Sequence, residues 1–197
     1  MKSKSHFLAE VIECSLARFT AQCWQREYIP SYGSLVAVDG KEGPIFGLVQ
    51  HIYTASDDPI RHVGAYQKTE EELLRDQPQI FAFIKTFFQV LIIGYVEKEH
   101  LFYEFAPIPV ALHSFVRRAT DEEYRYFFSH HYYLNLIFSQ VHLIDNVDEL
   151  LLGLIKSFRE KGVFESVIEA FVEQYSLLNS ADYRRLKFFM ERIEAGY

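Results

Sequence analysis

The spacing of apolar residues differs between the N-terminal part of this chain and the part after residue 120, and that difference decides its fold class. Up to residue 53, apolar side chains recur at every second position in several stretches, as in Phe7, Ala9 and Val11. A period of two predicts β-strands, because successive side chains of a strand point to opposite faces. Beyond residue 120, apolar residues recur every three or four positions, which predicts helices. We therefore expect an α+β protein, with strands first and helices last.

The N-terminal part is expected to form a small β-barrel domain over residues 6–118, with about six strands and a helical insertion. Residues 40–43 (Gly-Lys-Glu-Gly) have the composition of a hairpin loop. Several short strands joined by such turns are typical of a small barrel or sandwich. Residues 88–96 are expected to form a buried strand, with residues 101–105 as its hairpin partner.

The helical insertion is expected between these strands. Thr69 and Glu72 have the spacing of a capping box, in which each side chain bonds the other residue's backbone amide. Pro78 suits a first helical position, since its missing amide would have no partner there. The residues that follow it at helical spacing are Ile80, Phe81, Ile84, Phe87 and Phe88.

From residue 119 to residue 197 we expect an α-helical domain of four helices packed on the barrel. Thr120 and Glu123 predict a capping box, and the following residues 124–139 are apolar on nearly every side. A helix that is apolar all round is an enclosed one. A further capping box is expected at Asn146 and Glu149. The stripes of the last three helices are Val147, Leu150, Leu151, Leu154, Ile155 and Phe158, then Phe164, Val167, Ile168, Phe171, Val172 and Tyr175, then Tyr183, Leu186, Phe189, Met190 and Ile193.

Charge and cysteine content bound the cellular context. The net charge is −7, which disfavours broad electrostatic capture of nucleic acid, because phosphates are neutralised by clustered Lys and Arg. Cys14 and Cys23 are the only cysteines, and we interpret them as free thiols. No signal peptide and no apolar run of membrane-spanning length is seen in the sequence, so a cytoplasmic protein is expected.

The sequence carries no recognisable catalytic motif. The phosphate-binding loop GxxxxGK[ST], the dinucleotide fingerprint GxGxxG and the nucleophile elbow GxSxG are all absent. His130 and His131 are adjacent, which suits joint metal ligation poorly, and we interpret them as buried or half-buried helix residues. Arg117 and Arg118 are interpreted as solvated surface residues. We therefore predict a non-enzyme without catalytic, cofactor-binding or metal-binding residues. The aromatic residues interpreted as core rather than as a base-stacking platform are Tyr124, Tyr126, Phe127, Phe128, Tyr132 and Tyr133.

A series of short motifs over residues 6–118 resembles the HAS-barrel, the β-barrel domain of HerA-type DNA translocases and rotary ATP synthase subunits. The resemblance lies in the order and spacing of its pieces. These pieces are Tyr32-Gly-Ser-Leu-Val36, Phe46-Gly-Leu-Val49, Asp58-Pro-Ile-Arg61, Ala65-Tyr66, Thr69-Glu-Glu-Glu-Leu73, Gln77-Pro-Gln-Ile-Phe81, Ile93-Gly-Tyr95 and Pro107-Ile-Pro109. In that family the barrel precedes a RecA-like motor domain, which here is replaced by the helical region, so the resemblance implies no ATP hydrolysis.

What the resemblance does imply is a role in protein–protein interaction, as an adaptor, assembly or regulatory subunit. The implied partner is a RecA-like motor ATPase or a second copy of the chain. The interaction residues expected from the matching motifs are Asp58, Pro59, Arg61, Gln77 and Pro78. The alternative is a nucleic-acid-associated protein that uses the barrel face in DNA processing, and the acidic charge favours the first interpretation.

Overall fold

The strands form one antiparallel sheet that closes on itself. The computed structural model describes residues 6–25, 28–56 and 64–195. The sheet order is β2-β1-β7-β3-β4-β5-β6, and β2 also pairs with β5, so six strands form a ring and β6 pairs with β5 outside it. The strands are β1 (Phe7–Cys14), β2 (Arg18–Cys23), β3 (Leu35–Asp39), β4 (Pro44–Ser56), β5 (Ile84–Glu97), β6 (His100–Phe102) and β7 (Phe115–Arg118).

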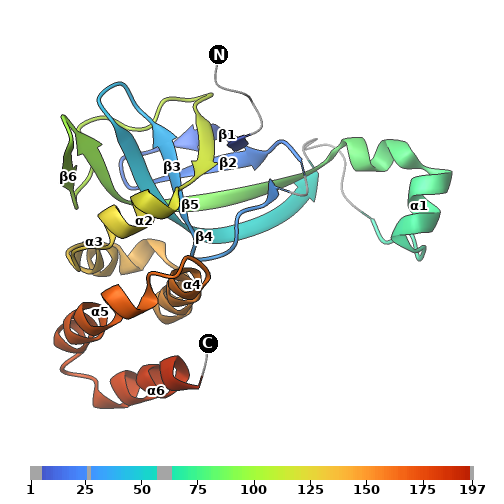
Figure 1. The fold of residues 1–197 in the computed structure, drawn as a ribbon. Helices are drawn as coiled ribbons and strands as arrows, with labels where there is room; N and C mark the ends of the chain where they lie inside the picture. The colour runs from blue at the N-terminus through green and yellow to red at the C-terminus, as the bar shows by residue number, and fades with distance from the viewer. Residues whose placement is uncertain (1–5, 26–27, 57–63, 196–197) are drawn as a thin grey trace.

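The helices fall into two groups (Figure 1). One group stacks on one side of the ring: α2 (Asp121–Phe127), α3 (Tyr133–Ser139), the short 3₁₀ helix η4 (Val141–Leu143), α4 (Val147–Glu160), α5 (Phe164–Leu178) and α6 (Tyr183–Glu194). The other group, α1 (Glu70–Asp76) and the 3₁₀ helix η3 (Pro78–Ala82), lies far from them at the end of β4 and β5. The α+β class is confirmed. None of the described helices is both long enough and apolar enough to span a bilayer.

Three strands supply side chains to two hydrophobic cores. In β3, Val36 and Val38 belong to the core inside the ring, whereas Leu35 and Ala37 belong to a second core against the helices. The period of two produces this division, because alternate side chains leave opposite faces of the strand. The sheet residues of the helix-facing core are Leu35, Ala37, Phe46, Leu48, Leu91 and Ile93. The ring and the helices therefore share their central strands.

Buried polar contacts reinforce this shared layer. The Tyr124 hydroxyl of α2 accepts a hydrogen bond of 2.7 Å from the Leu35 amide, and the Gln140 side chain donates to the Ile92 carbonyl over 3.3 Å. Gly33 adopts φ +76°, and a Cβ there would lie 2.4 Å from the Gly153 carbonyl carbon of α4. Only glycine fits this position, because both its backbone conformation and the close approach exclude a side chain.

Arg117 of β7 joins the sheet to the first helix of the stack, which corrects the prediction of a solvated arginine. Its guanidinium binds Glu123 of α2 through two bonds of 2.7 Å and reaches Asp39 of β3 at 2.7 Å. Its side chain is 17% exposed. Glu123 also accepts from the Thr120 amide, completing the predicted capping box. Arg118 is exposed, as predicted, and donates to the Ile29 carbonyl.

The prediction of four helices after residue 119 is wrong, because the described residues there form five α-helices. Residues 124–139 are not one helix: α2 ends at Phe127 and α3 begins at Tyr133. The rings of Phe128 and Tyr133 pack edge to face with centroids 4.9 Å apart. Residues five apart on a continuous helix point about 140° apart, so this contact needs the turn between α2 and α3.

The structure also differs from the expectation for residues 6–118 in three places. The helical spacing after Pro78 ends at η3, and Phe87 and Phe88 lie in β5, which pairs with β4 from Ile84 onwards. The partner strand β6 is shorter than expected. β7 was not predicted, and it completes the ring by pairing with β1 and β3. The hairpin between β3 and β4 and the Thr69 capping box are confirmed.

The first prediction concerns the shared core. A fragment of residues 1–118 uncovers the helix-facing side chains of β3, β4 and β5, and fully burying one such side chain contributes about 1.5–3 kcal/mol. We expect the fragment to aggregate or to melt well below the full chain in a thermal scan followed by circular dichroism. A fragment that stays monomeric and melts with the full chain would show that the ring folds independently.

The second prediction concerns Glu123 and pH. Burial raises the pKa of this carboxyl, but the hydrogen bonds from Arg117 and Thr120 outweigh it and hold the pKa below the ordinary 4.5. A lowered folded-state pKa adds stability above the unfolded pKa, and this is lost as the pH falls through the folded value. Glu123→Gln should therefore cost about 1–3 kcal/mol at pH 7, and its deficit should shrink as the pH falls below about 4.5.

The measurement is urea unfolding of both proteins between pH 7 and pH 3. Glu122→Gln is the matched control, because this neighbouring glutamate is exposed. It should follow the wild type at every pH. A Glu123→Gln deficit that stays constant with pH would contradict the ion-pair explanation.

Candidate interaction site on the projecting arm

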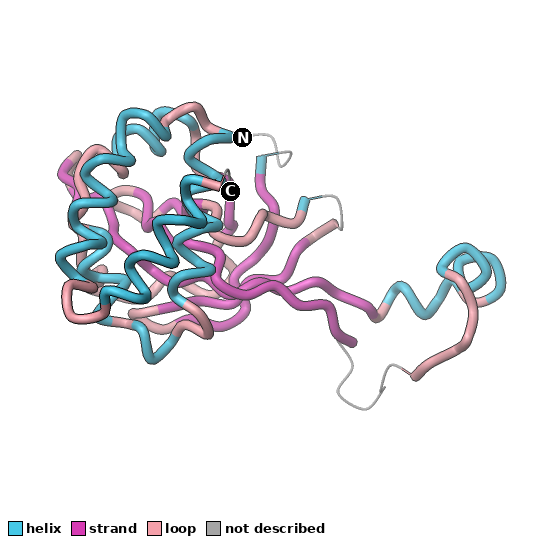
Figure 2. Tube along the Cα trace, turned by 90° about the horizontal axis from the view of Figure 1, so that it is seen from below, coloured by secondary structure: helices cyan, strands magenta, loops and turns pink. Residues whose placement is uncertain are grey.

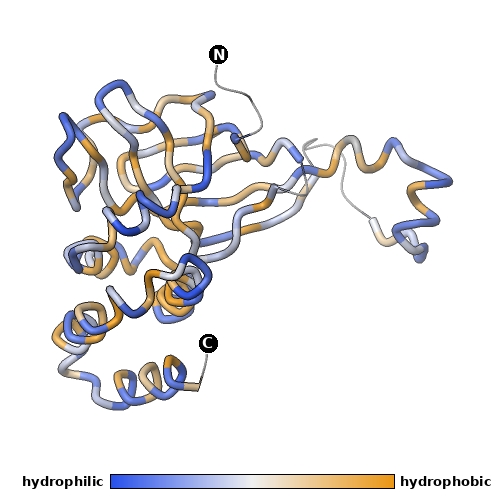
Figure 3. The backbone as a smooth tube through the Cα atoms, viewed as in Figure 1, coloured by the Kyte–Doolittle hydropathy of each residue, from blue (hydrophilic) through white to orange (hydrophobic). Residues whose placement is uncertain are grey.

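Residues 64–83, which we name the arm, project from the molecule. Figure 1 and Figure 2 both show α1 and η3 well away from the ring, beyond the ends of β4 and β5. No residue of α1 is buried. Figure 3 shows that most of this helix is hydrophilic, with a short hydrophobic stretch. α1 thus adds no buried residue to either hydrophobic core.

Local hydrogen bonds and ion pairs stabilise α1, which has no buried residue of its own. The Thr69 side chain accepts from the Glu72 amide and the Glu72 carboxylate accepts from the Thr69 amide over 2.8 Å. Lys68 and Arg75 each reach Asp76 at 2.9 Å. These bonds to Lys68 and Arg75 lower the pKa of the Asp76 carboxyl. A helix of seven residues is marginal in water alone, so the capping box and these ion pairs define its ends.

Apolar side chains on the arm face solvent. Leu74 is 49% exposed, and Tyr66 and Phe83 are also exposed. Single exposed apolar residues are common on protein surfaces. Here, however, three of them share a short projecting segment whose helix buries nothing. A projecting segment of this kind presents apolar surface that another protein can contact from several sides.

A pocket of about 330 Å³ lies where the arm meets the ring. It lies between the end of β2, the arm and the start of β5. Its lining combines apolar and aromatic groups with one carboxylate and one ammonium group. The lining residues are Cys23, Trp24, Gln25, Glu70, Leu74, Phe81, Ile84, Lys85 and Thr86.

The pocket lining suits contact better than covalent chemistry. Burial raises the pKa of the Cys23 thiol to about 11, so this cysteine is protonated and a poor nucleophile at neutral pH. Trp24 stands at the pocket and packs edge to face on Phe115, with centroids 5.0 Å apart. Phe7 completes this aromatic group at 5.1 Å from Phe115. A tryptophan that packs on other aromatic rings and remains partly exposed is a frequent anchor in protein interfaces.

The structure describes two of the five predicted interaction residues, and both lie on the arm. Gln77 ends α1, where its amide donates to the Leu73 carbonyl over 2.8 Å, and it begins η3, where its carbonyl accepts from Ile80. Pro78 follows as the exposed first residue of η3. The two residues form the bend between α1 and η3 and do not line the pocket. Asp58, Pro59 and Arg61 lie outside the described residues.

Sequence reasoning missed the pocket residues themselves. Trp24 is the only tryptophan and directly follows a predicted strand, which is the signal that could have singled it out. Leu74 is an apolar residue on a helix that is otherwise mostly charged. Their meeting with Phe81 depends on the path of the arm, which local sequence patterns do not give.

The residues considered for metal binding, base stacking or disulfide formation do not form such sites among the described residues. Within the described ranges, no group of three or more His, Cys, Asp or Glu residues is arranged to hold a metal ion. His130 and His131 lie in the turn between α2 and α3, not in a helix, and His130 is exposed. Of the six aromatic residues interpreted as core, four are buried, whereas Tyr126 and Tyr132 are exposed. Cys14 and Cys23 are free thiols, as predicted.

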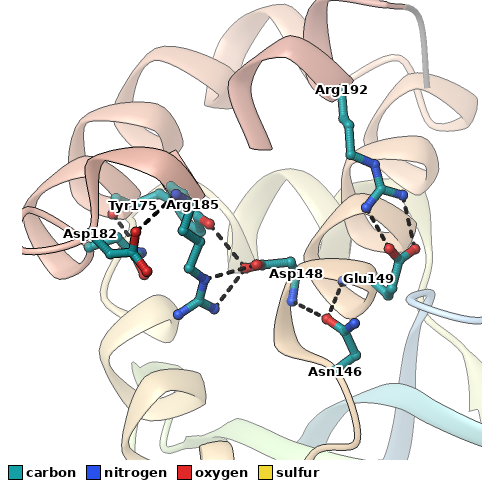
Figure 4. A network of polar contacts seen from close by, with 8 residues as sticks. Asn146, Asp148, Glu149, Tyr175, Asp182, Arg185 and Arg192 are labelled. Atoms are coloured by element: carbon teal, nitrogen blue, oxygen red, sulfur yellow. Dashed lines mark hydrogen bonds and ion pairs between the residues drawn. The ribbon is translucent and has the colours of Figure 1, made fainter. Parts of the chain in front are cut away.

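A polar network among the last helices holds them together (Figure 4). Asp148 of α4 accepts from the Tyr175 hydroxyl of α5 over 3.0 Å and from two nitrogens of Arg185 of α6 at 2.8 Å. Glu149 forms a second pair with Arg192. Burial first, and then the Asp148 charge, raise the pKa of Tyr175. The tyrosine therefore stays protonated and acts as a donor to Asp148, which fits a structural latch.

Comparison with known proteins adds no assignment. No protein-family model matches this chain, and no curated protein matches it.

Proposed function

We propose that this chain is a non-catalytic protein–protein interaction module, an adaptor, assembly or regulatory subunit, that binds its partner through the arm. The observation that carries the proposal is that α1 buries no residue while the arm exposes Leu74, Tyr66 and Phe83. The capping box and the ion pairs to Asp76 order this segment, and such ordering costs conformational entropy. Contact with another protein gives these apolar side chains the burial that the chain itself does not supply.

The pocket at the base of the arm supplies the specificity of this contact. Trp24, Leu74 and Phe81 offer apolar contact, and Glu70 and Lys85 offer one charge of each sign. This mixture suits an inserted side chain of a partner, with an apolar body and a polar end. Gln77 and Pro78 support the site by setting the bend of the arm rather than by lining the pocket.

The identity of the partner is proposed from the sequence resemblance. In the family that the sequence resembles, the barrel is followed by a RecA-like motor domain, whereas helices follow the ring here, so we propose a RecA-like motor ATPase as the partner. The ring of six strands and the helices packed on it are compatible with a small barrel bearing a helical domain. A cytoplasmic location is proposed along with this role, and the two free thiols agree with a reducing compartment.

The third prediction tests the arm with a matched pair of variants. Leu74→Asp places a charge on the arm, and Leu112→Asp places the same charge on a leucine of similar exposure (49% and 55%) outside the arm. Each protein is used to capture partners from native lysate, with mass spectrometry as the readout. We expect Leu74→Asp to capture at least tenfold less of the partner than the wild type captures. Leu112→Asp should capture as much as the wild type.

Both variants should keep the wild-type melting temperature, because neither leucine is in a core. The expected partner carries a RecA-like motor domain. Equal capture by the wild type and Leu74→Asp would contradict the arm as the binding site. Capture of a protein without such a motor, lost in Leu74→Asp alone, would retain the arm and reject the proposed partner.

A further inference from the structure

β4 and β5 extend beyond the ring and leave one sheet edge open. β3 pairs with β4 only as far as Leu48, with one further hydrogen bond from the Val49 amide to the Ser34 carbonyl. β4 then continues against β5 alone to Ser56. Among the described residues, no strand pairs with the outer side of residues 51–55, which we name the β4 tip. Figure 2 shows these two strands projecting from the ring.

The other open edges of the sheet carry protection that the β4 tip lacks. Exposed edges commonly have charged residues, proline or very short strands, which prevent pairing with another chain. β6 has three residues and is preceded by Glu97, Lys98 and Glu99. The β5 edge carries Lys85 beside the arm pocket. The β4 tip, His-Ile-Tyr-Thr-Ala, contains no proline, glycine, carboxylate, lysine or arginine.

The side chains of the β4 tip favour pairing with a further strand. Ile52 and Thr54 are β-branched, and Tyr53 stacks on Phe87 with centroids 5.3 Å apart while remaining 37% exposed. Thr54 and Thr86 share a hydrogen bond of 2.9 Å across the ribbon, which keeps the tip extended. The Nδ1 atom of His51 lies 3.5 Å from a carboxylate oxygen of Asp145.

We propose that the β4 tip pairs antiparallel with the β4 tip of a second copy of this chain, forming a two-fold symmetric dimer. Antiparallel pairing of one segment with itself uses the same donors and acceptors on both sides. Because the tip carries no ionised carboxylate, lysine or arginine, no register sets such like charges opposite each other. Pairing occupies the open edge of the β4 tip in both copies, so the assembly stops at two chains. This proposal goes beyond the partner of the arm and does not depend on it.

A second copy is a better occupant than a foreign peptide for an electrostatic reason. The tip itself supplies no carboxylate, lysine or arginine by which to select a different chain, whereas its own copy is always present with a complementary edge. The contact is small, so the dimer is expected to be weak and dependent on concentration. The exposed face of Tyr53 becomes covered when the second tip is in place.

The chain offers a matched pair of variants for the test. Tyr53 and Phe102 are both 37% exposed, and each stacks on an aromatic residue of β5, namely Phe87 and Tyr95. Tyr53 lies on the unprotected edge and Phe102 on β6. Tyr53→Lys adds to the β4 tip the charge that protected edges carry, and Phe102→Lys adds the same charge elsewhere.

The experiment is sedimentation equilibrium of the full chain at concentrations up to about 1 mM, where even a weak complex is populated. The wild-type mass should rise from 23.2 kDa toward twice that value. Tyr53→Lys should raise the dissociation constant at least tenfold, and Phe102→Lys should leave it within about twofold. A wild type that stays monomeric throughout overturns the proposal, as does a dimer that Tyr53→Lys does not weaken.

Amide hydrogen exchange of the unsubstituted protein gives a readout that does not depend on how Tyr53→Lys folds. Protection of the amides of the β4 tip should increase with protein concentration, while the amides of β6 should not change. Leu74→Asp separates this dimer from binding through the arm, because it should leave the dissociation constant unchanged. Loss of the dimer in Leu74→Asp would contradict pairing of the tips. Amide protection of the β4 tip that does not change with protein concentration would contradict it as well.

Discussion

The structure depends on burying both faces of β3, β4 and β5. An antiparallel sheet commonly packs one face on a core and leaves the other in water. Here the inner face fills the ring and the outer face carries the helices, so Leu35 and Val36, neighbours in sequence, serve different cores. Removing the helices would expose apolar side chains of three central strands. The buried Tyr124 hydroxyl and the Arg117 ion pairs add directional contacts to this layer. We therefore expect the ring and the helical part to unfold as one unit.

The features proposed to bind other chains lie where this packing ends. The arm is held by the Thr69 capping box and by ion pairs to Asp76, without a buried residue in α1. The β4 tip is paired on one side only. Both extend from the same pair of long strands, so the rigid centre sets their positions (Figure 2). We thus propose separate roles for two neighbouring surfaces, of which the arm offers side chains to a partner and the β4 tip offers backbone groups to a second copy.

Short-range sequence patterns predicted the helix caps and the apolar stripe that depend only on residues close together in the chain. The caps at Thr69 and Thr120 and the buried stripe through Leu151 and Leu154 needed only spacing and are confirmed. Tertiary contacts decided the rest. The helix over residues 124–139 breaks so that the rings of Phe128 and Tyr133 can meet, and the spacing around Phe87 fits both a helix and a strand. Of the site, the sequence pointed to Gln77 and Pro78 on the arm, but not to Trp24, because the pocket joins segments far apart in the chain.

Native-state hydrogen exchange with increasing urea shows whether the ring and the helices open as one folding unit across the shared strands. The amides to compare are those of β3 and β5 with those of α2 and α4. Elements that open only by global unfolding share one free energy of opening and one denaturant dependence. We predict that all four elements share both values. If the amides of α4 exchange through a lower-energy opening with a weaker urea dependence while β3 and β5 stay protected, the helical part unfolds separately and the claim is wrong.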